Sequence, residues 1–328
     1  MRYCDGKIIV TGGAGFIGSC VVRTLNEKGL KDIIIVDNIA STEKWRNISN
    51  KYYLEYIRKD IFINMLKRNC FHEISSIIHL GACSSTTEQN FDYLWENNVC
   101  YTKELWNYCK ERRIPFIYAS SAATYGNGDY GFDDKCNIDH LIPLNGYGCS
   151  KQVFDQWVIR QEVKPIQYVG LKFFNVYGPN EYFKGTMASM VYHGFNQIKK
   201  NGRIKLFKSE NAAYEDGGQL RDFIYVKDVC DVIMYFLENP QYSGLYNVGT
   251  GKAECFAELA RSVFHSLGLK PDIEYIEMPE KLKANYQYFT EAKISKLREI
   301  GYKKDFYTVN QGIYDYITSF LEKNYKIY

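Results

Sequence analysis

The sequence predicts an α/β protein built on a doubly wound parallel sheet, with a smaller α/β lobe interleaved in the second half of the chain. Three observations predict it. Short β-branched runs alternate with helix-like segments, a glycine-rich turn follows the first run, and the alternation loosens after about residue 174. Alternation of this kind is typical of parallel sheets with right-handed crossovers and helices on both faces.

The first elements are the clearest. Residues 7–11 form an apolar run that ends in glycines, which predicts a strand. Residues 16–28 place apolar side chains every third or fourth position, which is the period of a helix. Residues 32–37 read Asp-Ile-Ile-Ile-Val-Asp, a β-branched run typical of a strand buried on both faces.

The same pattern continues further along the chain. Residues 76–79 and 115–120 predict two more buried strands, and the helical periodicity of residues 94–112 places a helix between them. Later, residues 246–248 are strand-like and residues 255–267 are helical.

Two units are expected to share a cleft. A Gly-Pro pair at 178–179 and a polar, insertion-like stretch at 209–219 indicate the smaller lobe. The dinucleotide-binding unit is predicted at residues 1–173, 222–250 and about 297–321, and the substrate lobe at residues 174–221 and 251–296.

Composition excludes several classes of protein. The net charge is +3 and no basic run occurs, so we expect no nucleic-acid partner. No apolar stretch approaches the roughly 20 residues of a membrane span, and the first apolar run leads into glycines rather than into an export signal. The ten cysteines lie apart without a Cys-x-x-Cys pair, which predicts reduced thiols, no structural zinc and a cytoplasmic location.

The strongest local signal is a glycine motif between the first strand and the first helix. Gly12, Gly15 and Gly18 have the spacing Gly-x-x-Gly-x-x-Gly. The first allows a tight turn, the second a close approach to a pyrophosphate, and the third close packing of helix on strand. The N-terminus of the helix then offers N–H groups to the phosphates, which predicts a Rossmann-type dinucleotide site.

The choice between NAD and NADP depends on the end of the second predicted strand. Asp37 lies where an acidic residue accepts hydrogen bonds from the adenosine ribose, which favours NAD. Lys44 and Arg46 follow in the same loop and could hold a 2′-phosphate, unless they are simply solvated loop charges. We expect NADP, with NAD as the alternative.

Tyr147 and Lys151 form a Tyr-x-x-x-Lys pair, and residues four apart share one face of a helix. A tyrosine has a free pKa of about 10, so acting as a base near pH 7 requires roughly 4 kcal/mol of stabilisation of the phenolate. A lysine and a cationic nicotinamide could supply it together. Ser121, at the end of a predicted strand, would hydrogen-bond the reacting oxygen.

These residues carry a family resemblance. The chain resembles the extended short-chain dehydrogenase/reductase (NAD-dependent epimerase/dehydratase) family, and within it the ADP-glyceromanno-heptose 6-epimerases. The similarity runs nearly end to end. It includes Gly-Ala-Cys-Ser-Ser-Thr-Thr-Glu at 81–88, residues 119–126, Phe-Asn-Val-Tyr-Gly-Pro at 174–179, Lys-Gly-Thr-Met-Ala-Ser at 184–189 and Arg-Asp-Phe at 221–223.

The resemblance implies roles for individual residues. Tyr147 and Lys184 would be two acid/base residues on opposite sides of the substrate, Lys151 would bind the cofactor ribose and tune Tyr147, and Ser121 would assist. The cofactor would be lined by Gly12, Gly15, Phe16, Ile17, Gly18, Asp37, Asn38, Lys44, Lys59, Leu80, Gly81, Ala82, Cys83, Ser84, Asn97, Lys151, Val176 and Lys184. The sugar nucleotide would be lined by Ser84, Asn175, Thr186, His193, Phe207, Lys208, Ser209, Glu210, Arg221 and Tyr286.

Without the resemblance, Lys184 would be interpreted as a surface lysine and His193 as a helix-face residue. The chain also departs from the family pattern. Residues 211–220 form a longer stretch than in many relatives, and Gly146 precedes the tyrosine.

The implied reaction is epimerisation of ADP-D-glycero-D-manno-heptose to its L-glycero form, a step of lipopolysaccharide core biosynthesis. Carbon 6 is an unactivated stereocentre, so it cannot be inverted by simple proton removal. Transient oxidation of this carbon with bound NADP provides a route to inversion. The resemblance also implies a homo-oligomer, a pentamer. Other nucleotide-sugar 4-epimerases remain an alternative. A 4,6-dehydratase is disfavoured because Ala122 and Ala123 stand where it would carry an acidic pair, and a non-catalytic dinucleotide sensor would not need Tyr147 or Lys151.

Overall fold

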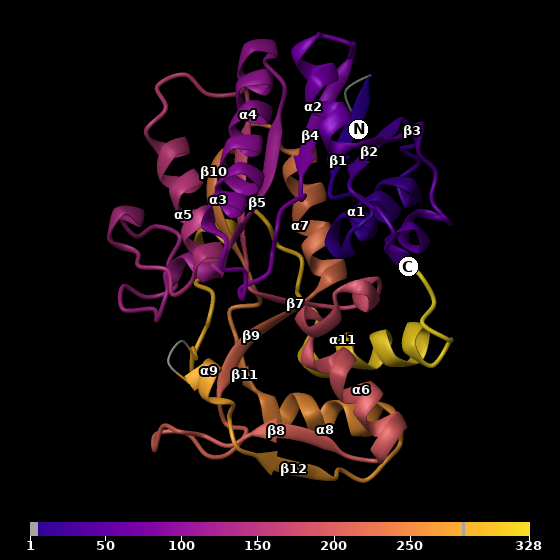
Figure 1. Cartoon of the computed structure of the whole chain (residues 1–328), viewed down its shortest axis with the longest axis vertical. Helices are drawn as coiled ribbons and strands as arrows, with labels where there is room; N and C mark the ends of the chain where they lie inside the picture. Colours follow the sequence, from indigo (N-terminus) through magenta and orange to yellow (C-terminus); the bar gives the residue numbers. More distant parts are fainter. Residues whose placement is uncertain (1–5, 284–285) are drawn as a thin grey trace.

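A computed structural model describes residues 6–283 and 286–328, with the side chains of residues 281 and 282 excepted. Its main element is a parallel sheet with the strand order β3-β2-β1-β4-β5-β6-β10 (Figure 1). The strands are β1 (Lys7–Thr11), β2 (Ile33–Asp37), β3 (Glu55–Arg58), β4 (Ile74–His79), β5 (Phe116–Ser121), β6 (Tyr168–Phe173) and β10 (Gly244–Val248). The predicted doubly wound parallel sheet is confirmed.

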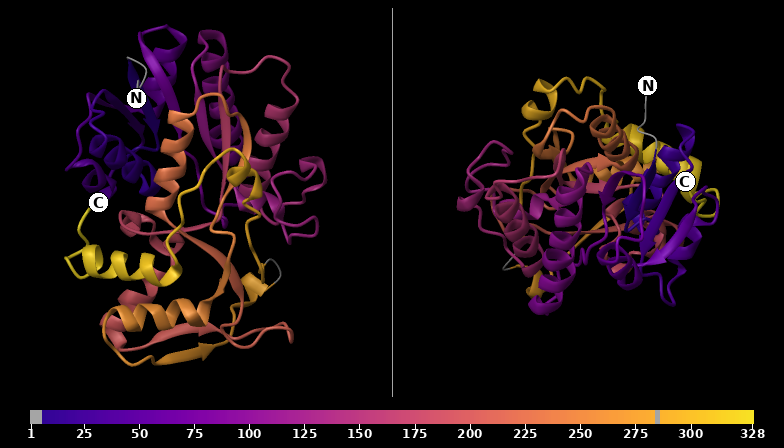
Figure 2. Two further views of the ribbon diagram at one scale, coloured as in Figure 1. Left: turned by 180° about the vertical axis from the view of Figure 1, so that it is seen from behind. Right: turned by 90° about the horizontal axis from the view of Figure 1, so that it is seen from above.

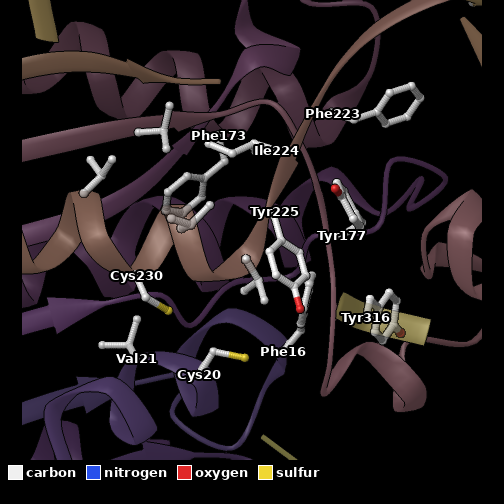
Figure 3. Packing of buried hydrophobic residues seen from close by; sticks show 14 of the residues in the cluster. Phe16, Cys20, Val21, Phe173, Tyr177, Phe223, Ile224, Tyr225, Cys230 and Tyr316 are labelled. Atoms are coloured by element: carbon white, nitrogen blue, oxygen red, sulfur yellow. The ribbon is translucent and has the colours of Figure 1, made fainter. Parts of the chain in front are cut away.

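Helices cover both faces of this sheet. Buried side chains of α1 (Phe16–Glu27) and α7 (Val226–Glu238) belong to one apolar core. Those of α2 (Lys59–Lys67), α4 (Tyr101–Arg112) and α5 (Gly146–Ile159) belong to a second core. Figure 3 shows part of the first core, where Cys20 and Val21 of α1 lie near Cys230 of α7. The β-branched strand runs therefore pack on both sides, as the sequence predicts.

The helix expected at residues 94–112 begins earlier and is not uniform. It consists of α3 (Phe91–Leu94), a π-helical stretch η2 (Trp95–Cys100) and α4. Asn90 caps its start by accepting a hydrogen bond from the backbone N–H of Tyr93 at 3.0 Å. Periodicity alone placed the start too late because the cap lies before the apolar pattern begins.

The smaller lobe lies beyond the carboxyl ends of the strands (Figures 1 and 2). It contains a sheet of order β11-β9-β7, made of β7 (Asn175–Tyr177), β9 (Leu220–Tyr225) and β11 (Ala253–Cys255). It also contains the parallel pair β8 (Ile204–Phe207) and β12 (Ile273–Ile276). The helices are α6 (Met190–Asn201), α8 (Phe256–Ser266) and α9 (Glu280–Lys283).

The remaining segments are short or lie near the C-terminus. They are η1 (Glu43–Ile48), η3 (Ala122–Tyr125), η4 (Ile138–His140), η5 (Glu181–Phe183), η6 (Gly185–Met187), α10 (Ser295–Glu299), α11 (Val309–Tyr316) and η7 (Ile317–Leu321). Within the described residues, no helix has the length and apolar character needed to cross a bilayer. The residue limits proposed for the two units stay a prediction, and β9 spans one of them.

Candidate active site

The glycine turn between β1 and α1 forms one wall of the site. Gly12 has φ +68°, and a Cβ there would lie 2.6 Å from the backbone nitrogen of Gly81. A Cβ on Gly18 would lie 2.1 Å from the carbonyl oxygen of Gly12, so neither position accepts a side chain. Gly15 precedes α1 without a side-chain cap, and no acidic residue occupies the first helical turn. This turn suits a pyrophosphate on the helix N-terminus.

Two cavities open beside this turn. The first, of about 380 Å³, lies over the carboxyl ends of β1, β4, β5 and β6, and the second, of about 180 Å³, extends past the end of β2. Each of the eighteen residues expected around the cofactor lines at least one of them. The glycine cradle and the uncapped helix fit a dinucleotide, and the assignment of these residues as cofactor ligands stays a prediction.

Asp37 and Lys44 are paired at the edge of the first cavity. The Asp37 carboxylate accepts from the backbone N–H of Ala14 at 3.0 Å, from that of Asn38 at 2.7 Å and from Lys44 Nζ at 2.9 Å. Both carboxylate oxygens are therefore already occupied. Arg46 instead forms an exposed ion pair with Glu43 at 2.5 Å and lines neither cavity. The structure places Lys44, but not Arg46, where it could meet a 2′-phosphate.

Tyr147 and Lys151 lie on α5 and both line the first cavity. Lys151 Nζ donates to the carbonyl oxygen of Ala119 at 2.8 Å. Burial lowers the pKa of Lys151 to about 8, with Asp155 acting in the opposite direction. Burial raises the pKa of Tyr147, and a hydrogen bond with Ser121 lowers it in part. The surroundings of Tyr147 thus favour the neutral phenol, and a positive charge placed beside it would lower its pKa.

Lys184 approaches the same cavity from the smaller lobe, between η5 and η6. Its ammonium group lies 5.7 Å from the centroid of the Phe16 ring. Burial lowers the pKa of Lys184, and Glu181 opposes the shift. The Glu181 carboxylate is fully buried and accepts from the Ser189 N–H at 2.6 Å, the Ser189 hydroxyl at 2.7 Å and the Gly178 N–H at 3.2 Å. The Lys184 segment is thereby held at both ends, beside the cavity that Tyr147 and Lys151 also line.

A third cavity of about 210 Å³ adjoins Tyr147 and Ser121 on the side of the smaller lobe. Asn175 lines it as expected, and so do four polar residues that the sequence did not single out: Thr86, Asn145, Gln287 and Thr290. Gln287 lies just after the predicted Tyr286, and Asn145 caps α5 by accepting the Gly148 N–H at 2.8 Å. In the first cavity Asn47, Asn180 and Phe183 were also missed.

Several expected substrate residues lie outside these cavities. Arg221 and Tyr286 pack together, with the guanidinium carbon 5.4 Å from the ring centroid, and the Arg221 guanidinium donates to the Gln287 carbonyl. The others outside the three cavities are Thr186, His193, Phe207, Lys208, Ser209 and Glu210. His193 lies on α6, and Lys208 and Glu210 are engaged with Glu277 and Lys283. A role for these residues in binding stays a prediction.

Among the described residues, no three His, Cys, Asp or Glu side chains converge on a point that could hold a metal ion. The arrangement consists of a dinucleotide cradle, the Tyr147 phenol and the Lys184 ammonium group lining the same cavity, and a polar pocket that adjoins Tyr147. Groups of these kinds can exchange protons with a hydroxyl-bearing substrate that is held against a redox cofactor.

Known proteins similar to this chain were found both by sequence and by structure. A model described as the NAD dependent epimerase/dehydratase family matches residues 8–249. A relative from Fusobacterium nucleatum subsp. nucleatum, named ADP-L-glycero-D-manno-heptose-6-epimerase, is 52% identical over 327 residues, covering 96% of this chain and 98% of the relative.

Solved structures are similar over the same extent. ADP-L-glycero-D-manno-heptose-6-epimerase of Helicobacter pylori has a TM-score of 0.80 at 29% identity, covering 97% of this chain and 99% of that one. UDP-N-acetylglucosamine 4-epimerase of Methanobrevibacter ruminantium has a TM-score of 0.82 at 26% identity, with the same coverage.

Proposed function

We propose that this chain, which belongs to the NAD dependent epimerase/dehydratase family, epimerises carbon 6 of ADP-glycero-D-manno-heptose. The observation that carries the proposal is the 52% identity, over nearly the whole of both chains, to a relative that bears this name. The paired acid/base groups support it, because inversion at carbon 6 needs proton transfer on two faces of that carbon.

Different residues of the chain have different roles in the proposed reaction. The glycine turn and α1 hold the pyrophosphate, and Asp37 and Lys44 hold the adenosine ribose. A nicotinamide dinucleotide held by these residues would supply reversible hydride transfer at carbon 6. Tyr147 and Lys184 each serve one face by moving the proton of the carbon 6 oxygen, and Ser121 orients that oxygen.

NADP is the proposed cofactor. Lys44 supports this assignment because its ammonium group, 2.9 Å from Asp37, neutralises the carboxylate that would repel a 2′-phosphate. NAD is the alternative, since Asp37 lies where a ribose diol would bind. Native mass spectrometry of the purified protein tests both this point and the proposed homo-pentamer, because it reports the mass of the retained cofactor and the number of subunits.

The activity itself is tested by incubating the protein with ADP-D-glycero-D-manno-heptose and following the carbon 6 epimers by proton NMR. We expect an equilibrium mixture of the two epimers without added cofactor. In parallel, UDP-N-acetylglucosamine and UDP-glucose test for 4-epimerisation, the activity named for the similar Methanobrevibacter ruminantium structure. Turnover of a UDP-sugar without turnover of the heptose would overturn the assignment.

A further inference from the structure

A buried ion pair lies behind the candidate active site and outside all three cavities. It joins Asp155 of α5 to Lys172 of β6, with Nζ and Oδ2 2.8 Å apart and both side chains 0% exposed. Replacing a buried ion pair by apolar residues is often neutral or stabilising, so stability alone does not explain such a pair. The proposed chemistry gives it no direct part either.

Asp155 continues the line of functional residues on α5. Tyr147, Lys151 and Asp155 are spaced four apart and therefore share one face of the helix. The Asp155 carboxylate accepts from the Tyr118 hydroxyl at 2.9 Å and from the Ser120 hydroxyl at 2.6 Å. Two residues of β5 are thus fastened to the helix beside the site.

Two more residues of β5, Ser121 and Ala119, are linked to the network through Lys172 and Lys151. Lys172 Nζ donates to the Thr124 hydroxyl at 2.8 Å, and that hydroxyl donates to the carbonyl oxygen of Ser121 at 2.8 Å. Lys151 Nζ donates to the Ala119 carbonyl at 2.8 Å. Consecutive residues at the end of β5 are each tied to this network, and Ser121 is the last of them.

The network also has an electrostatic effect on the site. Asp155 favours the charged form of Lys151 and opposes ionisation of Tyr147, so it acts on the pKa of each. Other titratable groups that face the network are Tyr118 of β5, Tyr125 of η3, His79 of β4, Cys83 after β4, Cys136 and Lys296 of α10.

We propose that Asp155 and Lys172 act as a positioning pair, which holds Ser121 and Lys151 in register with Tyr147. The charge of Asp155 also favours the ammonium form of Lys151. The inference rests on the proposed function, from which Ser121, Lys151 and Tyr147 take their roles. Neither residue of the pair lines any of the three cavities. Both act through the residues that do.

The double variant Asp155→Asn with Lys172→Met tests the pair without leaving one charge buried alone. We expect a folded protein whose kcat falls about 10- to 100-fold, because small displacements of catalytic groups have large effects on rate. The alkaline limb of the pH–rate profile should move to lower pH, since the variant loses the carboxylate that favours the charged form of Lys151; the accompanying loss of Lys172 limits the size of this displacement. NADP affinity, measured by fluorescence across the same pH range, should show the same displacement.

Tyr118→Phe is the matched control, because it removes one hydrogen bond to Asp155 and leaves both charges in place. Its pH profile should coincide with that of the wild type. If the double variant does not fold, Thr124→Val cuts the link between Lys172 and Ser121 without removing charge, and it should lower kcat about tenfold or more.

A folded double variant with wild-type kcat and pH profile, or a Thr124→Val variant with wild-type kcat, would overturn the positioning role. A wild-type protein that binds NADP but does not epimerise the heptose would instead overturn the proposed function. In that case the pH dependence of NADP binding in the double variant still decides whether Asp155 keeps Lys151 cationic.

Discussion

Replacing Lys44 with alanine should weaken NADP binding far more than NAD binding. Lys44 Nζ lies 2.9 Å from Asp37 Oδ1 and 3.0 Å from the carbonyl oxygen of Asn38. Its loss removes a cation from the proposed 2′-phosphate site and leaves the Asp37 carboxylate, only 9% exposed, without its ion-pair partner. The same loss removes one of the two donors to Asp37 Oδ1, so this oxygen can accept a ribose hydroxyl, which is the contact that NAD requires.

The magnitude follows from the exposure of the pair. A hydrogen bond to a charged group contributes about 1.5–3 kcal/mol. The Lys44 side chain is 26% exposed, so partial solvent screening favours the lower part of that range. We therefore expect the dissociation constant of NADP to rise about 10- to 30-fold while that of NAD changes less than about twofold.

Isothermal titration calorimetry with both cofactors at low and high salt measures these constants. Arg46→Ala is the matched control, because Arg46 is exposed, pairs with Glu43 and lines neither cofactor cavity. It should leave both constants unchanged. Equal weakening of NADP and NAD by Lys44→Ala would refute the reasoning, since it would mean that Lys44 only supports the fold of the loop.

Further predictions address the chemistry and the fold. Tyr147→Phe and Lys184→Met should each lower the epimerisation rate about 100- to 10,000-fold, measured by NMR of the carbon 6 epimers; near wild-type turnover of the Lys184 variant would leave Tyr147 to serve both faces. Excess free deuterated NADPH should leave no deuterium in the product by mass spectrometry, and stoichiometric label would contradict a closed redox cycle on bound cofactor. Gly18→Ala should abolish tight cofactor binding, because its Cβ would meet the Gly12 carbonyl at 2.1 Å; titration with wild-type affinity would disprove the steric argument. Burial raises the pKa of Asp228 to about 7. Between about pH 4 and 7 the folded protein therefore binds more protons at this group than the unfolded chain does. The contribution of this group to the free energy of unfolding consequently falls as pH rises. Denaturant unfolding of Asp228→Asn should therefore give a gain in stability relative to the wild type that grows from pH 4 to pH 7, and a constant difference would refute the assigned pKa.

Much of the fold was accessible from the sequence because its strands are buried on both faces. Runs such as residues 33–36 contain only β-branched apolar residues. The site forms at the carboxyl ends of the strands that these runs build. The glycine motif was equally readable, since a turn that excludes a Cβ at Gly12 and Gly18 tolerates only one residue type. Local patterns of this kind require no knowledge of distant contacts.

Long-range placement was harder to predict. Arg46 and Lys44 are equivalent in sequence, yet only Lys44 lines the cofactor cavity, because η1 turns one toward Asp37 and the other toward Glu43. Lys184 could be predicted as a catalytic residue only from the family resemblance, because its burial depends on packing between the lobes. Nothing in the sequence indicated that Lys172 is buried, because a lysine in an apolar strand is recognised as buried only when its partner on another element is known.

The interleaving of the two lobes has a mechanical consequence. The three strands of the smaller sheet come from separate stretches of chain, and each connects closely to the large sheet or its helices. Phe174 alone separates β6 from β7, α7 begins directly after β9, and β11 follows β10 after residues 249–252. No single cut between the lobes would release an intact domain, because each fragment would keep only part of a sheet. The two lobes should therefore melt as one calorimetric transition, and any opening of the cleft must bend these three connections together with the segment that returns the chain from α9 to α10.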